Sequence, residues 1–175
     1  MPELPKSLEI LNCSHNPILS LDYLPVNLFE LNCRRNLITS IDFLPNSLKK
    51  LNCSYNKIKM LTNLPNNLLD IHCDSNEIEI LNIEKLNKLT LLSCYNNKIT
   101  SLTNIPDSLK ELDCCANKIT QLNNLPENLE RLLCKNNNFD ILENLPNSLN
   151  FLQCDQTIQN LVQIKNNNPN LNIVH

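Results

Sequence analysis

Nine cysteines carry most of the chemical reactivity in this 175-residue chain. Thiolates bind zinc, form disulfides and act as nucleophiles, and each use requires its own spacing. Eight of the nine recur every 20 residues, with one interval of 21, as Cys13, Cys33, Cys53, Cys73, Cys94, Cys114, Cys134 and Cys154. None of them belongs to a C-x-x-C pair. This regular interval indicates a structural repeat in which cysteine serves as a small apolar residue.

Buried free thiols are the expected state of this cysteine column. Side chains stacked in one inner row point in parallel and do not converge on a tetrahedral zinc site, which is the competing interpretation. The cysteine count is odd and follows the repeat period, which argues against a secreted disulfide framework. We therefore expect a reducing, intracellular compartment and no bound metal.

Catalytic residues are not apparent in the sequence. Cys115, the cysteine outside the column, lies near Asp113 and Glu111, whose charges raise the pKa of a thiol and disfavour a nucleophile. The histidines are spread far apart along the repeats, as His15, His72 and His175. The chain has no glycine with which to build a phosphate-binding loop. We expect a protein that is not an enzyme and that holds no cofactor.

The cysteine column belongs to a unit of 20 residues, of which LPNSLKKLNCSYNKIKMLTN, at positions 44–63, is one copy. Its pattern is L-P-x-x-L-x-x-L-x-C-x-x-N-x-I-x-x-L-x-x, and a fixed period of this length is the signature of a solenoid. An asparagine column follows the cysteines as Asn16, Asn36, Asn56, Asn76, Asn97, Asn117 and Asn137. An amide both donates and accepts hydrogen bonds, so we expect an interior polar ladder that satisfies the backbone of adjacent turns.

These columns match L-x-x-L-x-L-x-x-N-x-L, with cysteine in the third apolar position, and resemble the leucine-rich-repeat family over residues 4–164. The repeat length and the L-P-x-x-L opening are similar to the short repeats of bacterial secreted effectors. The cysteines, the many asparagines and the lack of glycine are similar to uncharacterised leucine-rich-repeat proteins of giant DNA viruses. The resemblance implies a leucine-rich-repeat solenoid with short parallel β-strands on the concave face. It also implies extended, polyproline-like or 3₁₀ segments on the convex face, and little or no α-helix.

A single domain of about eight repeats is expected over residues 1–175, with a capping strand at about residues 166–175. Residues 82–89 replace the L-P opening and add one residue, which indicates a short helical turn or a tolerated insertion. In the absence of glycine, we expect asparagine at turn positions with positive φ. The first strand, at residues 10–14, has no cap, and end turns need a polar cover. We therefore expect weak self-association through the N-terminal edge.

Composition argues against several classes of partner. The net charge of −3 gives no basis for a nucleic-acid groove or for binding to an anionic membrane. No apolar run approaches the roughly 18 residues that span a bilayer. Met1 leads directly into the first repeat without the pattern of a signal peptide. We expect an intracellular protein, located in the host cytoplasm if the chain is viral or an effector.

Outward strand positions form the concave face, where function is expected. The fold does not require apolar residues there, and aromatic and arginine side chains are typical interface anchors. Drift on an exposed sheet is the competing explanation for the aromatic residues. Glu30, Lys50 and Asp70 alternate in sign on adjacent strands, which favours a self-neutralising row over a recognition site. The candidate partner-binding residues are Tyr55, Leu91, Tyr95, Leu133, Phe151, Arg34 and Arg35.

The resemblance implies a non-enzymatic scaffold that binds a protein partner through its concave face, a host protein if the chain is viral or bacterial. One alternative is the substrate-recognition part of a ubiquitin-ligase-type system that acts through a separate partner, because some bacterial effectors with similar repeats carry a ligase domain. The other alternative is a repeat protein with a mainly architectural role. The fold alone does not identify the partner.

Overall fold

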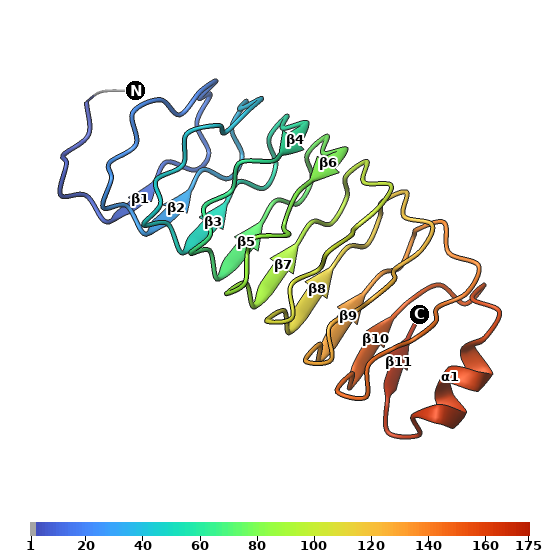
Figure 1. The fold of residues 1–175 in the computed structure, drawn as a ribbon. Helices are drawn as coiled ribbons and strands as arrows, with labels where there is room; N and C mark the ends of the chain where they lie inside the picture. The colour runs from blue at the N-terminus through green and yellow to red at the C-terminus, as the bar shows by residue number, and fades with distance from the viewer. Residues whose placement is uncertain (1–2) are drawn as a thin grey trace.

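The computed structural model describes residues 3–175, which form one elongated stack of turns with short strands side by side (Figure 1). All neighbouring strands are parallel, so the solenoid predicted from the 20-residue period is confirmed. The strands make one nine-stranded sheet in the order β1-β2-β3-β5-β7-β8-β9-β10-β11. They are β1 (Ile10–Asn12), β2 (Glu30–Asn32), β3 (Lys50–Asn52), β5 (Asp70–His72), β7 (Leu91–Ser93), β8 (Glu111–Asp113), β9 (Arg131–Leu133), β10 (Phe151–Gln153) and β11 (Asn172–Val174).

The repeat period keeps equivalent residues next to one another across the sheet. The strand pairs from β1 to β5 and from β7 to β10 place residues 20 apart in register, and Asp70 pairs with Leu91 across the longer unit. The extra residue lies outside the sheet, in the segment 82–89, which forms two successive turns. In the second of these, the N–H of Leu89 donates to the carbonyl of Leu86 at 2.9 Å. The insertion therefore leaves the strand register unchanged.

The core is a continuous apolar column that runs along the solenoid. The middle residue of each strand points inward, because side chains alternate along a strand, and from β2 to β10 it is at most 1% exposed. The cysteine two residues later is fully buried from Cys33 to Cys154, whereas Cys13 in the first turn is half-buried. All nine cysteines are free thiols, which confirms this part of the sequence prediction.

The asparagine column forms the predicted ladder between turns. The Nδ2 group of Asn36 donates to the carbonyl of Cys33 in its own turn at 2.9 Å and to that of Cys13 in the preceding turn at 3.1 Å. Its Oδ1 accepts from the N–H of Ile18 at 3.1 Å. The same three contacts recur as far as Asn137. Each amide thus joins two turns. It also forms hydrogen bonds with backbone N–H and C=O groups that the apolar side chains of the core cannot satisfy.

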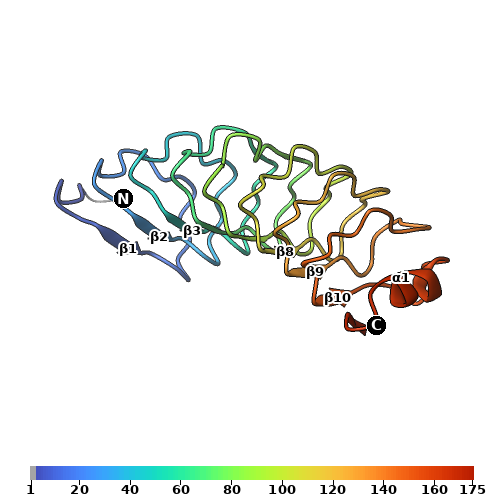
Figure 2. The ribbon, with the colours of Figure 1, turned by 60° about the horizontal axis from the view of Figure 1, so that its bottom comes forward.

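The return path on the convex side is extended and, between residues 13 and 160, has no α-helix, which confirms the predicted fold class. Figure 2 shows the strands along the inner side of the curve and the extended segments along its outer side. Two outer segments pair as a second small sheet, β4 (Met60–Leu61) with β6 (Ile80–Leu81). After each L-P step the chain turns, as where the N–H of Leu28 donates to the carbonyl of Pro25 at 3.1 Å.

Left-handed turn positions hold a wider range of residues than the sequence analysis predicts. Asparagine takes five of the eleven positive-φ positions found in residues 3–175, as Asn96, Asn104, Asn124, Asn136 and Asn144. The other six are His15, Tyr23, Arg35, Tyr55, Ser75 and Ala116. Most of these six follow a cysteine by two residues, where the strand leaves the sheet. The prediction that asparagine fills such positions is therefore wrong for most of the strand exits.

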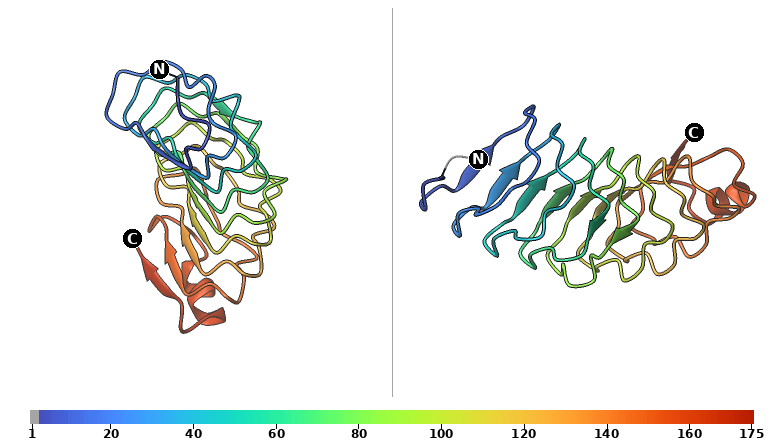
Figure 3. Two further views of the ribbon diagram at one scale, coloured as in Figure 1. Left: turned by 90° about the vertical axis from the view of Figure 1, so that its left-hand side faces the viewer. Right: turned by 90° about the horizontal axis from the view of Figure 1, so that it is seen from above.

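The two ends of the solenoid differ. At the C-terminal end, α1 (Leu161–Asn167) buries Ile164, and β11 pairs with β10 (Figure 3). We predict little or no α-helix from the sequence, with a capping strand at about residues 166–175; the strand is present as β11, but α1 occupies Leu161–Asn167. Apolar residues spaced by three, Ile158, Leu161 and Ile164, provide the helical face that the strand prediction overlooks. At the N-terminal end, β1 has no neighbour beyond it within the described chain. Residues 3–175 contain no helix long and apolar enough to cross a membrane.

Candidate functional site: the concave face

The sheet presents its outward side chains in rows on the concave face. The fold places every predicted contact residue there, because each occupies an outward strand position or the strand exit. The structure then separates these residues into an N-terminal cluster, a central groove and a C-terminal stack.

The N-terminal cluster consists of Arg34, Arg35 and Tyr55. The guanidinium carbons of Arg34 and Arg35 lie 4.4 and 5.2 Å from the centre of the Tyr55 ring, which are cation–π contacts. Tyr55 is 40% exposed and has a φ of 59°, a conformation that costs energy for a bulky side chain. The cluster therefore offers two cations and an aromatic edge that the core does not use.

A groove occupies the centre of the face, over β5, β7, β8 and β9. It encloses about 250 Å³ and brings together Leu91 and Leu133, which lie two strands apart. The polar side chains that line it are His72, Ser93, Glu111, Asp113 and Arg131. The two leucines are among the contact residues predicted from the sequence, whereas these polar neighbours are not, although the register of the repeats places them in adjacent columns.

Asp74 organises the edge of the groove near Tyr95. Its carboxylate accepts hydrogen bonds from the hydroxyl of Ser93, from the hydroxyl of Ser54 at 3.2 Å and from the N–H of Tyr95 at 3.0 Å. Because Ser54, Asp74 and Ser93 belong to three successive turns, these hydrogen bonds connect the three turns. The Tyr95 side chain remains 42% exposed, so its backbone is fixed while its ring is available for contact.

The surroundings of Asp113 in the groove shift the pKa of its carboxyl group. Burial raises its pKa above the usual range, and the nearby Asp74 adds to this effect. The N–H of Cys115, which donates to Asp113 Oδ1 at 3.0 Å, and the charge of Arg131 act in the opposite direction. Asp113 is half-buried, and a cation close to it would favour its charged form.

Cys115 is covered rather than open to solvent. Although it lies outside the inner cysteine column, it is only 7% exposed. Burial, followed by the charge of Asp113, raises its pKa to about 12. The direction predicted for this thiol is confirmed, but burial contributes more than the carboxylate. A neutral, covered thiol is a poor nucleophile.

The cysteine column inside the sheet is also held neutral. Burial raises the pKa of Cys53 to about 12, and it raises the pKa of Cys73, Cys94 and Cys114 well above the ordinary value. Within the described chain, no group of three or more His, Cys, Asp or Glu side chains is arranged to hold a metal ion.

Phe151 forms the C-terminal stack with Arg131. The guanidinium carbon of Arg131 lies 3.9 Å from the centre of the Phe151 ring, and both side chains are half-buried. The stack holds Arg131 at the margin of the groove and leaves its charge facing the concave side. Phe151 is among the contact residues predicted from the sequence, whereas Arg131 is not.

The charged row of Glu30, Lys50 and Asp70 does not form the predicted self-neutralising ladder. The register places these residues on adjacent strands, but the ion pairs within 4.0 Å in residues 3–175 are Lys98–Glu77 and Lys110–Glu130. Exposed side chains in water gain little from such a pair and lose conformational freedom. The charges of this row therefore remain available to a partner.

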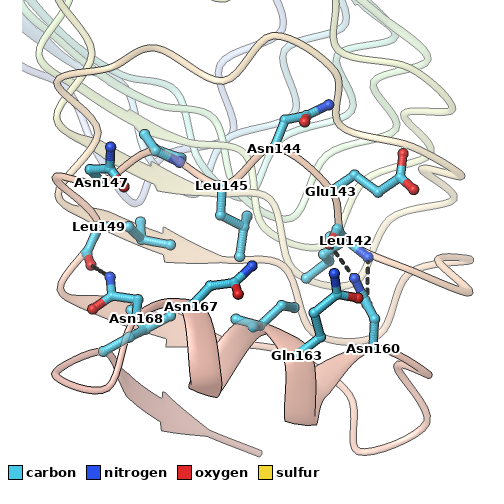
Figure 4. A pocket seen from close by; sticks show the side chains of 13 residues that line it. Leu142, Glu143, Asn144, Leu145, Asn147, Leu149, Asn160, Gln163, Asn167 and Asn168 are labelled. Atoms are coloured by element: carbon cyan, nitrogen blue, oxygen red, sulfur yellow. Dashed lines mark hydrogen bonds between the residues drawn. The ribbon is translucent and has the colours of Figure 1, made fainter.

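A second pocket lies between α1 and the last full turn (Figure 4). It encloses about 420 Å³, and five of its thirteen lining residues are asparagines. Two of these amides are already used in the fold, since Asn160 exchanges hydrogen bonds with the backbone of Leu142 and Asn168 donates to the carbonyl of Leu149. The pocket has one titratable side chain, Glu143, so it offers no acid–base pair.

Comparison with solved structures identifies the class of repeat. The chain is similar to YopM from Yersinia enterocolitica WA-314, with 35% identity and a TM-score of 0.84 over 87% of this chain and 35% of that one. It is similar to the functional domain of InlJ from Listeria monocytogenes, which includes a cysteine ladder, with 30% identity and a TM-score of 0.76 over 86% of this chain and 35% of that one. It is also similar to a Shigella effector LRR domain, with 25% identity and a TM-score of 0.72 over 95% of this chain and 80% of that one.

The InlJ domain is described as including a cysteine ladder, and this chain has a column of free cysteines that is buried from Cys33 to Cys154. The chain spans about a third of the YopM and InlJ structures that it matches. No family model and no curated protein matches the sequence.

Proposed function

We propose that this leucine-rich-repeat solenoid, of the type found in bacterial effectors, is a scaffold that binds a protein partner through its concave face. The fold and the similarity to a Shigella effector LRR domain support the general class. The central groove is the observation that supports the site, because Leu91 and Leu133 flank it although the fold does not require apolar side chains there. Because the chain is similar to a bacterial effector domain, we propose that the partner is a protein of a host cell.

The distribution of charge supports a partner with a matching pattern. Arg34, Arg35 and Lys50 outnumber Glu30 and give the N-terminal third of the face a positive character. The centre is mainly negative, since Asp70, Asp74, Glu111 and Asp113 lie there with a single arginine of the groove, Arg131. Charge bands of this kind orient a partner and raise the rate of association. Leu91, Leu133 and the Tyr95 ring supply the apolar contacts, and a few anchor residues, tyrosine prominent among them, carry most of the affinity at interfaces.

A paired affinity capture from host-cell lysate tests this proposal. The baits are the wild-type chain, the variant Leu91→Glu/Leu133→Glu in the groove, and the matched variant Ile80→Glu/Ile141→Glu on the convex side. Ile80 and Ile141 are 54% and 43% exposed, so the control adds the same charge at exposed apolar positions elsewhere. We expect a protein that is retained by wild type and by the convex variant but lost from the groove variant. Retention of the same proteins by all three baits, with circular dichroism unchanged, contradicts the proposal.

A further inference from the structure

Two exposed aromatic residues lie outside the concave face, at a corner of the first turns. Tyr23 is 97% exposed and Phe43 is 80% exposed, and both directly precede an L-P step. They occupy the same position of successive turns, because the register of β1, β2 and β3 places residues 20 apart side by side. Val26, 74% exposed, lies just after the same corner. We call Tyr23, Val26 and Phe43 the corner patch.

The backbone of Tyr23 gives no reason for an aromatic residue at this position. Its φ is 60°, in the left-handed region that a bulky side chain disfavours. At the same corner of later turns, the left-handed residue is asparagine, which tolerates this conformation: Asn104, Asn124 and Asn144. A side chain that is 97% exposed also contributes nothing to the core. Strained residues of this kind tend to lie where a surface binds something.

A hollow lies next to the corner patch. It encloses about 710 Å³, and its apolar lining comes from Tyr23 and Val26 together with Leu4, Leu24 and Pro25. The hollow is supported from the next turn, since the hydroxyl of Ser47 donates to the carbonyl of Val26 at 2.7 Å. Tyr23 and Val26 thus belong to the apolar lining of the hollow, and Phe43 occupies the position of Tyr23 in the next turn.

The charges around this surface are mainly negative. Glu3 and Asp22 line the hollow, and Asp42 directly precedes Phe43. None of these carboxylates belongs to either ion pair found in the described part of the chain, and Lys6 is the one cation that lines the hollow. The charge at the rim therefore complements a positively charged ligand.

We infer that the corner patch binds an amphipathic, positively charged peptide segment of a protein partner. Apolar side chains of the segment pack on Tyr23, Val26 and Phe43, while lysine or arginine side chains lie against the rim carboxylates. The same carboxylates repel an anionic membrane surface, so a peptide fits the charge better than a lipid bilayer does. This surface is distinct from the central groove, and the inference does not depend on the function proposed for the concave face.

The variant Tyr23→Asn/Phe43→Asn tests the inference without threatening the fold. It introduces the residue found at this corner of other turns, Asn63 and Asn104 among them. The probe is a fluorescein-labelled helical peptide of leucine and lysine, and its analogue with glutamate in place of lysine is the charge control. Ile141→Gln is the matched control variant. It also replaces an exposed apolar residue, and the glutamine it introduces is the residue at the equivalent position of the preceding turn, Gln121.

We expect the leucine–lysine peptide to bind wild type and Ile141→Gln equally, and the corner variant at least tenfold more weakly. In methyl NMR spectra of the wild type, we expect the largest shifts at Val26, Leu4 and Leu24. The inference is overturned if the corner variant binds the leucine–lysine peptide as tightly as wild type does. It is also overturned if wild type binds the glutamate peptide as tightly as the leucine–lysine peptide, or if it binds neither peptide. Phosphatidylcholine vesicles that bind wild type, but not the corner variant, also overturn it in favour of a membrane surface.

Discussion

At the scale of single residues, the solenoid depends on buried amides that serve two turns at once. Asn56 is 9% exposed, and its Nδ2 group donates to the carbonyls of Cys53 at 2.9 Å and Cys33 at 3.0 Å. Its Oδ1 accepts from the N–H of Ile38 at 3.0 Å. An apolar replacement leaves these backbone groups buried and without partners, which is more costly than the loss of the hydrogen bonds themselves.

We predict that Asn56→Ala lowers the free energy of unfolding by about 3 kcal/mol, because several buried backbone groups lose their partners. Asn16→Ala is the control, since Asn16 lies in the exposed first turn and its amide bonds only to carbonyls of its own turn. We expect that change to cost less than about 1 kcal/mol. Urea unfolding followed by circular dichroism measures both values. Equal losses would mean that the ladder does not join the turns.

The buried thiols make the stability of the fold sensitive to alkaline pH. In the unfolded chain a thiol ionises near its ordinary pKa of 9.0, whereas burial raises the pKa of Cys53 to about 12. Between these values the folded thiol keeps its proton and the unfolded thiol does not. The stabilisation is therefore complete below pH 9 and is lost as the pH rises toward 12.

We predict that the buried thiols add no pH dependence to the free energy of unfolding below pH 8. Between pH 9 and 11 they lower it by about 1.4 kcal/mol per pH unit for each buried thiol. Urea titrations at a series of pH values measure the slope. Cys94→Ala, which removes one fully buried thiol, is expected to make the slope shallower by one such increment. A stability that does not change up to pH 11 would contradict the neutral state assigned to the column.

At the scale of elements, the two ends of the sheet are protected to different degrees. β11 and α1 cover the C-terminal end, whereas Leu8, Leu11, Cys13 and Ile18 of the first turn are only half-buried. The strand β1, Ile-Leu-Asn, carries no charge. Charged side chains are a common means of keeping a free strand edge from pairing with another chain.

We predict weak self-association through β1, and we expect Ile10→Lys to abolish it, because Ile10 is 54% exposed and a lysine at the edge disfavours strand pairing. Sedimentation equilibrium at increasing concentration provides the measurement. Ile80→Lys, on β6, is the control for added charge. A monomeric mass for the wild type at high concentration would rule out this contact.

Repetition explains why the sheet could be predicted from the sequence and why the ends could not. Each strand repeats the inward and outward alternation and the register of its neighbours. A prediction of strand position in one turn is therefore supported by the equivalent residues of the other turns. The seven-residue helix α1 has no such copies, and it depends on the packing of Ile164, which no local pattern specifies. Short helices are not stable by propensity alone.

The same reasoning applies to the candidate sites. The register placed Leu91 and Leu133 on the concave face, but the stack of Arg131 on Phe151 depends on rotamers that the sequence does not reveal. Tyr23 was missed because only the structure shows that its corner is left-handed and its ring fully exposed. A comparison of its column with Asn104 was an available signal, since an aromatic residue there replaces a turn-forming one.

At the scale of the whole molecule, one sheet presents a continuous curved surface on a rigid core. Each turn bonds to the next through the strands and through the amide ladder, so the concave face acts as a preformed template. Preformed surfaces bind with little loss of conformational entropy. The rows of the face can therefore change in charge and shape without changes to the fold, which is the property expected of a recognition scaffold.

The position of the partner on this template is the central claim, and site-specific photo-crosslinking locates it directly. A benzophenone amino acid is introduced at Leu91, in the groove, and in a second protein at Ile141, on the convex side. We predict that the protein captured by the wild type crosslinks efficiently to position 91 and not to position 141. Efficient crosslinking from position 141 alone would place the partner on the convex side and contradict the assignment of the concave face.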